Sequence, residues 1–308
     1  MPTDALPPLT VEQLIRQGAE SFEREQLFFG HGSDNALDEA AELVFFGAGL
    51  RHEEAPEVYA RTLDAEQRSR IEGLFERRIR ERVPAAYLTR RMWFAGHEFY
   101  VDQRVLVPRS PIAELIEARF EPWIDAASVQ RILDIGTGSG CIAIAAALAL
   151  PDAKVDAGDI SEDALAVTRI NIERHAVEGR VRAVRSDVFD ALANERYDVI
   201  VSNPPYVGDE ELAGLPSEYA REPRLGLHGG GDGLDIVRRI LRDARGHLSS
   251  HGILIVEVGN SEEALIEAYP RAPFTWLEFE RGGGGVFVLT AEQLEEIDRD
   301  IGDRDRKN

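Results

Sequence analysis

The chain has 308 residues, 44% of them hydrophobic and 30% charged, which is typical of a folded globular protein and allows two domains. The formal charge of −21 argues against broad contact with nucleic-acid phosphates and favours a basic protein partner. A single cysteine excludes an internal disulfide, and the scattered histidines predict no metal site. The sequence shows no signal peptide and no membrane-spanning run, which favours a cytoplasmic protein without membrane contact.

Residues 1–90 have the periodicity of helices and predict a small N-terminal helical domain. Thr10 and Gln13 have capping-box spacing at the start of the first helix, and Asp64 is the expected cap of the third. The apolar stripes predicted for the second and third helices are Leu37, Ala40, Ala41, Val44 and Phe45, and Ile71, Leu74, Phe75 and Ile79. This domain contains no evident catalytic constellation.

A linker follows at residues 91–109. Aromatic and β-branched residues dominate from Met92 to Pro108, with Gly96 at a turn, and predict a β-hairpin. Ser110 is the expected cap of the next helix, with Pro111 at its first position. The remaining residues, 110–308, form the predicted catalytic domain.

Strand and helix patterns alternate from about residue 130. The seven expected strands are residues 131–135, 154–159, 180–186, 197–202, 253–258, 274–280 and 286–290. The last two are too close in sequence to be parallel neighbours, because a parallel crossover needs about a dozen residues. The pattern therefore predicts an α/β, Rossmann-like sheet that is mostly parallel with one antiparallel strand. We expect the tail at 298–308 to be frayed.

A glycine loop follows the first strand of this domain. Its pattern is D-x-G-x-G-x-G, from Asp134 to Gly140, without the G-x-G-x-x-G spacing of a dinucleotide site and without a phosphate-loop lysine. Asp159 ends the next strand, where a carboxylate can bind a ribose diol. These features favour a nucleoside cofactor without a pyrophosphate, such as S-adenosylmethionine; a nicotinamide cofactor is the less favoured alternative. Cys141, next to the loop, is expected to be a small buried residue rather than a reactive thiol.

The stretch "VSNPPYV" ends the fourth strand, so it lies at the edge of the sheet where ligands bind. A planar NH₂ group is a poor nucleophile, and a site that methylates it has to hold both hydrogens. The Asn203 side-chain carbonyl and the Pro204 backbone carbonyl can each accept one. Pro204 and Pro205 stiffen the turn, and Tyr206 offers a flat ring to the planar group. The alternative for this motif alone is a rigid turn.

These motifs together resemble the class I S-adenosylmethionine-dependent methyltransferases, and Asn-Pro-Pro-Tyr is similar to the motif of enzymes that methylate amino groups of adenine, guanine or glutamine. The resemblance implies that Asn203, Pro204, Pro205 and Tyr206 are catalytic and bind the substrate. The cofactor-binding residues that the loop, the strand ends and the resemblance indicate are Asp134, Gly136, Thr137, Gly138, Ser139, Gly140, Asp159, Ile160, Asp187, Val188 and Asn203.

The flanking segments "YLTRRMWFAGHEFYVDQRVLVPR" and "EPRLGLHGGGDGLDIVRRIL" resemble the protein-(glutamine-N5) methyltransferase family. The release-factor branch of that family has Pro-Arg-Pro-Glu-Thr-Glu where this chain has "PRSPIAEL". This departure, together with the segments "FFGHGSDNALDEA" and "PFTWLEFERGGGGVFVLT", resembles the branch that acts on large-subunit ribosomal protein three (uL3). The resemblance implies methylation of a glutamine amide in this basic partner, with substrate recognition by the helical domain. Arg109 either orients the substrate peptide or braces the linker.

Other functions stay open at this point. The same chemistry could act on peptide chain release factors, or on adenine or guanine in nucleic acid, although the acidic charge and the lack of a basic recognition module oppose direct DNA binding. A non-catalytic ribosome-assembly factor on a methyltransferase scaffold is the third alternative; the intact Asn203 and glycine loop oppose it.

Overall fold

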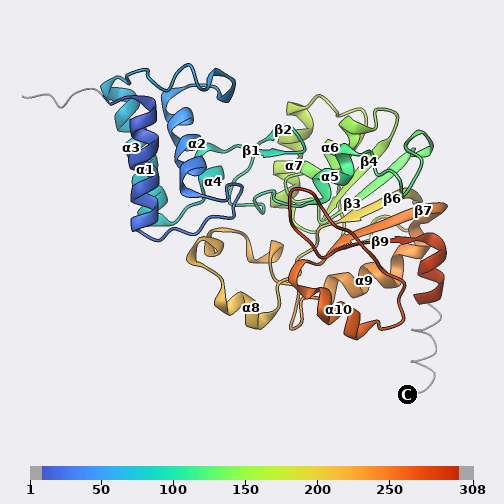
Figure 1. Ribbon diagram of the computed structural model, residues 1–308. Helices are drawn as coiled ribbons and strands as arrows, with labels where there is room; N and C mark the ends of the chain where they lie inside the picture. Colours follow the sequence, from blue (N-terminus) through green and yellow to red (C-terminus); the bar gives the residue numbers. More distant parts are fainter. Residues whose placement is uncertain (1–8, 298–308) are drawn as a thin grey trace, which may run out of the picture. The chain divides into compact units, whose positions relative to one another are not determined.

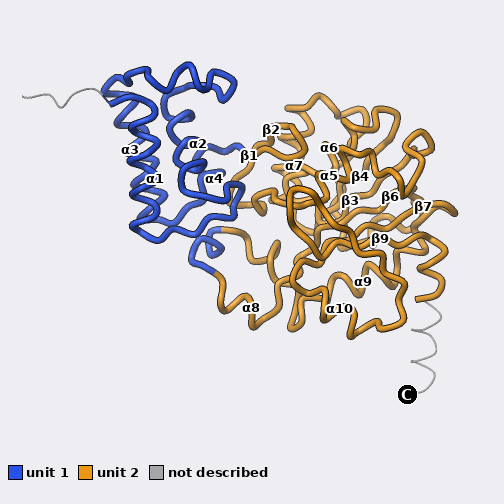
Figure 2. Tube along the Cα trace, in the orientation of Figure 1, with its two compact units in different colours: residues 1–91, 216–221 blue, residues 92–215, 222–308 orange. Residues whose placement is uncertain are grey.

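A computed structural model describes residues 9–297, and the chain divides into two compact units (Figures 1 and 2). Unit 1 comprises residues 1–91 and 216–221, and unit 2 comprises residues 92–215 and 222–308. The sequence predicts a helical domain that ends at residue 90, but no pattern indicates that the short segment 216–221 belongs with it. The predicted frayed tail, 298–308, lies outside the described residues.

Unit 1 is built from helices. They are α1 (Val11–Arg24), α2 (Ala36–Ala48), α3 (Ala65–Glu81) and α4 (Ala85–Thr89), with 3₁₀ turns η1 (His52–Glu54) and η3 (Ser217–Arg221). The predicted capping box of α1 and the predicted cap of α3 are confirmed: the Gln13 amide donates to Thr10 Oγ1 at 3.2 Å, and the Gln67 amide donates to Asp64 Oδ1 at 2.8 Å. These bonds satisfy amides that have no partner within the first turn.

The apolar stripes of unit 1 were predicted only in part. Ala40, Val44, Phe45 and Ile71 are buried, as expected, whereas Leu37 is 49% exposed. Ala41, Leu74, Phe75 and Ile79 are half-buried, and the side chain that α3 buries most completely, beside Ile71, is the cation of Arg78. A periodic pattern of apolar residues cannot find a buried cation, because the partners that stabilise it come from elsewhere in the chain.

Glu39 and Glu218 accompany Arg78. The Arg78 guanidinium donates from Nε to Glu39 and from Nη2 to the Phe28 carbonyl at 2.8 Å, and it lies 3.4 Å from Glu218. The Phe28 amide also donates to Glu218 at 3.1 Å. Burial raises the pKa of Glu218, but the Phe28 N–H and the Arg78 charge outweigh it, so that the pKa is lower than usual. Glu218 thereby fixes segment 216–221 within unit 1.

Unit 2 begins with the predicted hairpin, which is shorter than expected. Strands β1 (Met92–Phe94) and β2 (His97–Phe99) pair antiparallel, and the chain beyond Phe99 is irregular. The next helix, α5 (Ile112–Glu117), has Pro111 as its N-cap, so the prediction of Ser110 as the cap was wrong by one residue. Ser110 still contributes, because its Oγ accepts a bond from the Ile112 amide at 3.2 Å.

The central sheet of unit 2 has seven strands in the order β5-β4-β3-β6-β7-β9-β8 (Figure 1). The strands are β3 (Arg131–Ile135), β4 (Lys154–Asp159), β5 (Val181–Arg185), β6 (Tyr197–Ser202), β7 (Leu248–Glu257), β8 (Thr275–Trp276) and β9 (Val286–Thr290). Strand β9 alone runs antiparallel to its neighbours. The predicted mostly parallel α/β fold is confirmed, although the sixth strand is much shorter than expected.

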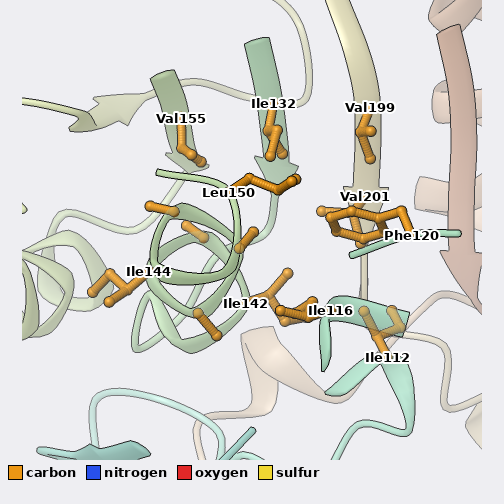
Figure 3. Packing of buried hydrophobic residues seen from close by; sticks show 14 of the residues in the cluster. Ile112, Ile116, Phe120, Ile132, Ile142, Ile144, Leu150, Val155, Val199 and Val201 are labelled. Carbon is orange, nitrogen blue, oxygen red and sulfur yellow. The ribbon is translucent and has the colours of Figure 1, made fainter. Parts of the chain in front are cut away.

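Helices cover both faces of the sheet. They are α5, α6 (Cys141–Ala149) and α7 (Glu162–Arg174) on one face, and α9 (Asp235–Asp243) and α10 (Glu262–Ala268) on the other, with α8 (Asp209–Gly214) after β6. Ile132 and Val199 point toward α6, which is apolar all round and deeply buried (Figure 3). Their neighbours Leu133 and Ile200 face the second core. Burial on both faces explains the nearly continuous apolar strands.

No helix within residues 9–297 is both long enough and apolar enough to cross a membrane.

Candidate active site

A cavity of about 250 Å³ lies in unit 2, next to the carboxyl ends of β3 and β6. The chain runs from β3 to β4 and β5 on one side of β3 and then crosses to β6 on its other side, so this is the switch point at which open α/β sheets bind ligands. The lining residues include Arg109, Gly136, Thr137, Gly138, Ser139, Asp159, Ile160, Asp187, Val188, Asn203, Pro204, Pro205, Leu225, Ile236 and Arg239.

The glycine loop forms one wall of the cavity. Gly136 and Gly138 have φ of 72° and 56°, and a Cβ at either position would meet no atom within 4 Å. Their bare backbones therefore face open space, which a side chain would occupy. The loop is fixed from behind, since the Gly136 and Thr137 amides both donate to the Gly158 carbonyl on β4.

Asp134, the acid of the glycine motif, does not line the cavity. It is fully buried, and its Oδ2 accepts bonds from the Thr137 hydroxyl at 2.5 Å and the Ala143 amide at 3.1 Å. Among the described residues its Oδ1 has no partner. Burial raises the pKa of Asp134 to about 7. Its visible role is to join the glycine loop to the start of α6. Gly140, also absent from the lining, is the N-cap of α6, with φ of 82°.

Asp159 lies beside the glycine loop at the end of β4. Its Oδ2 accepts from the Gly138 amide at 2.9 Å, and its Oδ1 accepts from the Ser161 amide at 2.8 Å. Burial raises the pKa of this carboxyl, while these bonds oppose the rise. Each oxygen keeps a second lone pair, so that the carboxylate can still accept hydroxyl donors from a ligand.

Asp187 follows β5 and is paired with a residue that the sequence analysis missed. Arg239 on α9 donates to Asp187 Oδ1 at 2.8 Å, and both side chains line the cavity. Ile160, which is 46% exposed, and Leu225, which is 59% exposed, add apolar surface. This part of the cavity combines apolar walls with a few polar groups, which is typical of small-molecule sites. Arg239 lies within a helical pattern, and nothing in that pattern marks it.

The motif after β6 is divided between two hollows. Asn203, Pro204 and Pro205 line the cavity with the glycine loop, as the sequence predicts. Tyr206 lines a neighbouring hollow of about 670 Å³ instead, and its hydroxyl donates to Glu257 at 3.0 Å. Arg109 lines both hollows. The predicted contact of the Tyr206 ring with a planar acceptor stays a prediction.

Arg109 of the linker forms an ion pair with Glu222. Its two terminal nitrogens each donate to one oxygen of Glu222 at 2.8 Å, and the Val107 amide donates to the same carboxylate at 2.9 Å. The Glu222 side chain is fully buried. Of the two predicted roles, this two-point geometry supports bracing the linker.

Cys141 is buried, and this burial raises its thiol pKa to about 12. It is therefore protonated at neutral pH and unsuited to act as a nucleophile.

Three features define the class I methyltransferase fold: a doubly wound sheet with one antiparallel strand next to its edge, a glycine loop after β3 and an Asn-Pro-Pro-Tyr motif after β6. Residues 120–215 match the family model described as methyltransferase small domain. The 16S rRNA N2 G1207 methyltransferase of Thermus thermophilus, solved with AdoMet and guanosine, matches at a TM-score of 0.45 and 19% identity, covering 65% of this chain and 48% of that one.

Two curated relatives match over nearly the whole chain. The ribosomal protein uL3 glutamine methyltransferase of Xanthomonas campestris is 52% identical over 287 residues, which cover 92% of each chain. The protein of the same name from Xylella fastidiosa is 50% identical over 285 residues, which cover 92% of this chain and 91% of that one. The chain therefore belongs to the ribosomal protein uL3 glutamine methyltransferase family, as the flanking segments predict.

Proposed function

We propose that this protein transfers a methyl group from S-adenosylmethionine to the side-chain amide nitrogen of a glutamine in ribosomal protein uL3. The observation that carries the proposal is the identity of 50–52% with two uL3 glutamine methyltransferases over 92% of the chain. The net charge of −21 supports a basic acceptor protein. A ribosomal protein as acceptor also supports the predicted cytoplasmic location, and substrate recognition by the helical unit is part of the proposal.

The cavity fits the cofactor. The bare backbones of Gly136 and Gly138 form a cradle for its amino-acid end, and Asp159 has oxygens for a ribose diol. Ile160 and Val188 are placed to pack against an adenine ring, with Asp187 as a polar partner. When bound, S-adenosylmethionine supplies an electrophilic methyl group on a sulfonium.

The acceptor side of the site depends on Asn203 and Pro204. The Asn203 side-chain carbonyl and the Pro204 backbone carbonyl would each accept one amide hydrogen. These two bonds would fix the orientation of the substrate NH₂ group. Pro204 is buried and Pro205 half-buried, so the turn that carries these acceptors is fixed before any substrate binds. No strong base is required before the attack, because holding the poor nucleophile in line with the methyl group supplies a large part of the acceleration.

The test is methyl transfer from labelled S-adenosylmethionine to four purified acceptors: uL3, a peptide chain release factor, ribosomal RNA and DNA. We expect label in uL3, with one glutamine-containing peptide heavier by the mass of a methylene. Label in the release factor alone, or in nucleic acid alone, would overturn the proposed substrate. No transfer to any acceptor would support a non-catalytic assembly factor.

A further inference from the structure

Glu257 is a buried carboxylate beside the Asn-Pro-Pro-Tyr motif, residues 203–206, which is called the acceptor motif below. The proposed mechanism does not use Glu257. It is the last residue of β7, the strand that pairs with β6, and it is 5% exposed. Its Oε2 accepts the Ser110 hydroxyl at 2.5 Å, and its Oε1 accepts the Tyr206 hydroxyl at 3.0 Å. One carboxylate thus joins Ser110, directly after the linker, to the tyrosine of the Asn-Pro-Pro-Tyr motif.

Residues directly after Glu257 hold the rest of Tyr206. Gly259 has φ of 47°, and a Cβ there would lie 2.5 Å from Cε2 of the Tyr206 ring, so the ring rests against bare backbone. The Ser261 hydroxyl donates to the Tyr206 carbonyl at 2.8 Å. The end of β7 therefore fixes the ring and the main chain of Tyr206, and Glu257 fixes the direction of its hydroxyl.

We propose that Glu257 is a positioning residue of the methyl transfer, which acts through Tyr206 and ties the acceptor motif to Ser110, the residue directly after the linker. The proposal rests on the proposed function for its chemistry. A tyrosine held at its ring, its carbonyl and its hydroxyl has one orientation, and it therefore presents a fixed edge to the turn that contains Asn203. Loss of the carboxylate would leave the ring in place but release its hydroxyl.

The protonation of Glu257 provides a specific signature. The charged and titratable groups facing it are Arg109 from the linker, Tyr206 after β6, and Glu262 and Glu263 of α10, which line the same hollow. Burial raises the pKa of Glu257 to about 7, against the bonds from Ser110 and Tyr206 and the charge of Arg109. The ionised carboxylate accepts both hydroxyls. Once protonated, it has to donate from one oxygen, so one hydroxyl must turn away.

The first measurement does not depend on the methyl acceptor. The full chain, labelled with ¹³C at the tyrosine ring, is followed by NMR between pH 5.5 and pH 8.5, and Tyr206→Phe identifies the Tyr206 signal. We expect this signal to shift with a midpoint near neutral pH in the wild type and to lose this transition in Glu257→Gln. A Tyr206 signal that titrates identically in both proteins would overturn the proposal, whatever the substrate is.

The second measurement is a double-mutant cycle on methyl transfer. Glu257→Gln and Tyr206→Phe should each lower kcat about tenfold, and the double variant should lose little more, because both remove the same bond. S-adenosylmethionine affinity should change less than about twofold, since neither residue lines the cofactor cavity. Multiplied losses in the double variant would overturn the proposal. Inactivity of the wild type toward uL3 would instead overturn the proposed function, while the NMR result would still decide the role of Glu257.

Tyr197→Phe is the matched control. Tyr197 is also a buried tyrosine that donates to a carboxylate, Asp156, at 2.8 Å, but neither residue lines either hollow. Its kcat should equal that of the wild type. An equal loss of kcat in Tyr197→Phe and Tyr206→Phe would mean that any buried tyrosine bond acts through general stability, and it would overturn the specific role of Glu257.

Discussion

Buried acids at the two ends of the central sheet have different partners. Toward the amino ends of the strands, Asp156 accepts bonds from Arg131 Nη2 at 3.0 Å and from Arg182 Nε at 2.8 Å, besides the bond from Tyr197. The charge of this acid is balanced by the two arginines. The pKa of Arg182 is raised chiefly by its bond to Asp156. Burial lowers the pKa of Arg131, but Glu195 and Asp156 outweigh this effect and raise it. The cluster is an ion-pair network that joins β3, β4, β5 and β6.

At the carboxyl ends, Asp134, Asp159 and Glu257 accept bonds from backbone N–H groups and hydroxyls. Burial raises the pKa of all three. Neutral donors fix the direction of a carboxylate without cancelling its charge, so it stays sensitive to a ligand or a proton. One sheet thus uses buried acids for stability at its amino end, and at its carboxyl end for a site that is sensitive to a ligand or a proton.

The largest effect expected is from Asn203→Ala at the carboxyl end. Removal of one preorganised acceptor should lower kcat about 100- to 1,000-fold, by analogy with the loss of an oxyanion-hole donor. The melting temperature should stay close to that of the wild type, because Asn203 lies half-buried on the cavity wall. Methyl transfer to uL3 and thermal unfolding measure the two effects. Wild-type activity in this variant would contradict the proposed catalytic role of Asn203.

Gly233→Ala should lower the free energy of unfolding by about 2–3 kcal/mol. Gly233 has φ of 78°, and a Cβ there would lie 2.1 Å from the Tyr206 carbonyl oxygen, so the acceptor motif would have to move. Gly246→Ala is the control, because a Cβ at Gly246 meets nothing within 4 Å. Urea unfolding of both variants gives the comparison; equal stabilities would show that the turn tolerates displacement.

Asp156→Asn tests the amino end. It removes the charge that Arg131 and Arg182 share, and it should lower the free energy of unfolding by about 1–2 kcal/mol, since both arginines are partly exposed to solvent. The kcat of the folded enzyme at 25 °C should stay at the wild-type value. A fall in kcat without loss of stability would break the distinction between the two ends of the sheet.

The smallest expected effect is a pH dependence of stability. Because the pKa values of Asp134 and Glu257 are raised to about 7, the folded state binds protons more tightly than the unfolded state. Stability from their protonated forms is present below the unfolded pKa values and is lost as the pH rises through 7. Urea unfolding at constant ionic strength should show this fall, and between pH 5.5 and pH 6.5 Glu257→Gln should make it smaller by about 1 kcal/mol. An unchanged slope in Glu257→Gln would contradict the raised pKa.

The sequence predicts the cavity well because its chemistry lies in local motifs. The glycine loop, Asp159 and Asn203 each follow a strand, and strand ends of a parallel sheet meet at one edge. The bonds that position these motifs were not predictable in the same way. Glu257 stands in the strand pattern "ILIVEV" and Arg239 in a helical one, and their partners, Tyr206 and Asp187, are 51 and 52 residues away. Tertiary contacts of single polar residues leave no periodic signal.

Arg78 illustrates the same limit in unit 1. The helical period of α3 is correct, but the side chain that it buries is chosen by Glu39 and Glu218, which come from distant parts of the chain. The hairpin and the sixth strand were predicted too long for another reason: aromatic and β-branched residues there pack against the core outside any ladder, as Val105, Val107 and Phe279 do.

The place of segment 216–221 in unit 1 sets the covalent topology of the protein. The chain passes from one unit to the other three times, after Arg91, after Leu215 and after Arg221. A protease cut in the linker near residue 91 would therefore release residues 1–91 covalently, but segment 216–221 would stay with the other fragment and could hold them through contacts such as the Arg78–Glu218 ion pair. The helical unit could not be exchanged as a simple N-terminal module. Any graft of this helical unit onto another catalytic domain has to carry the loop with Glu218 as well.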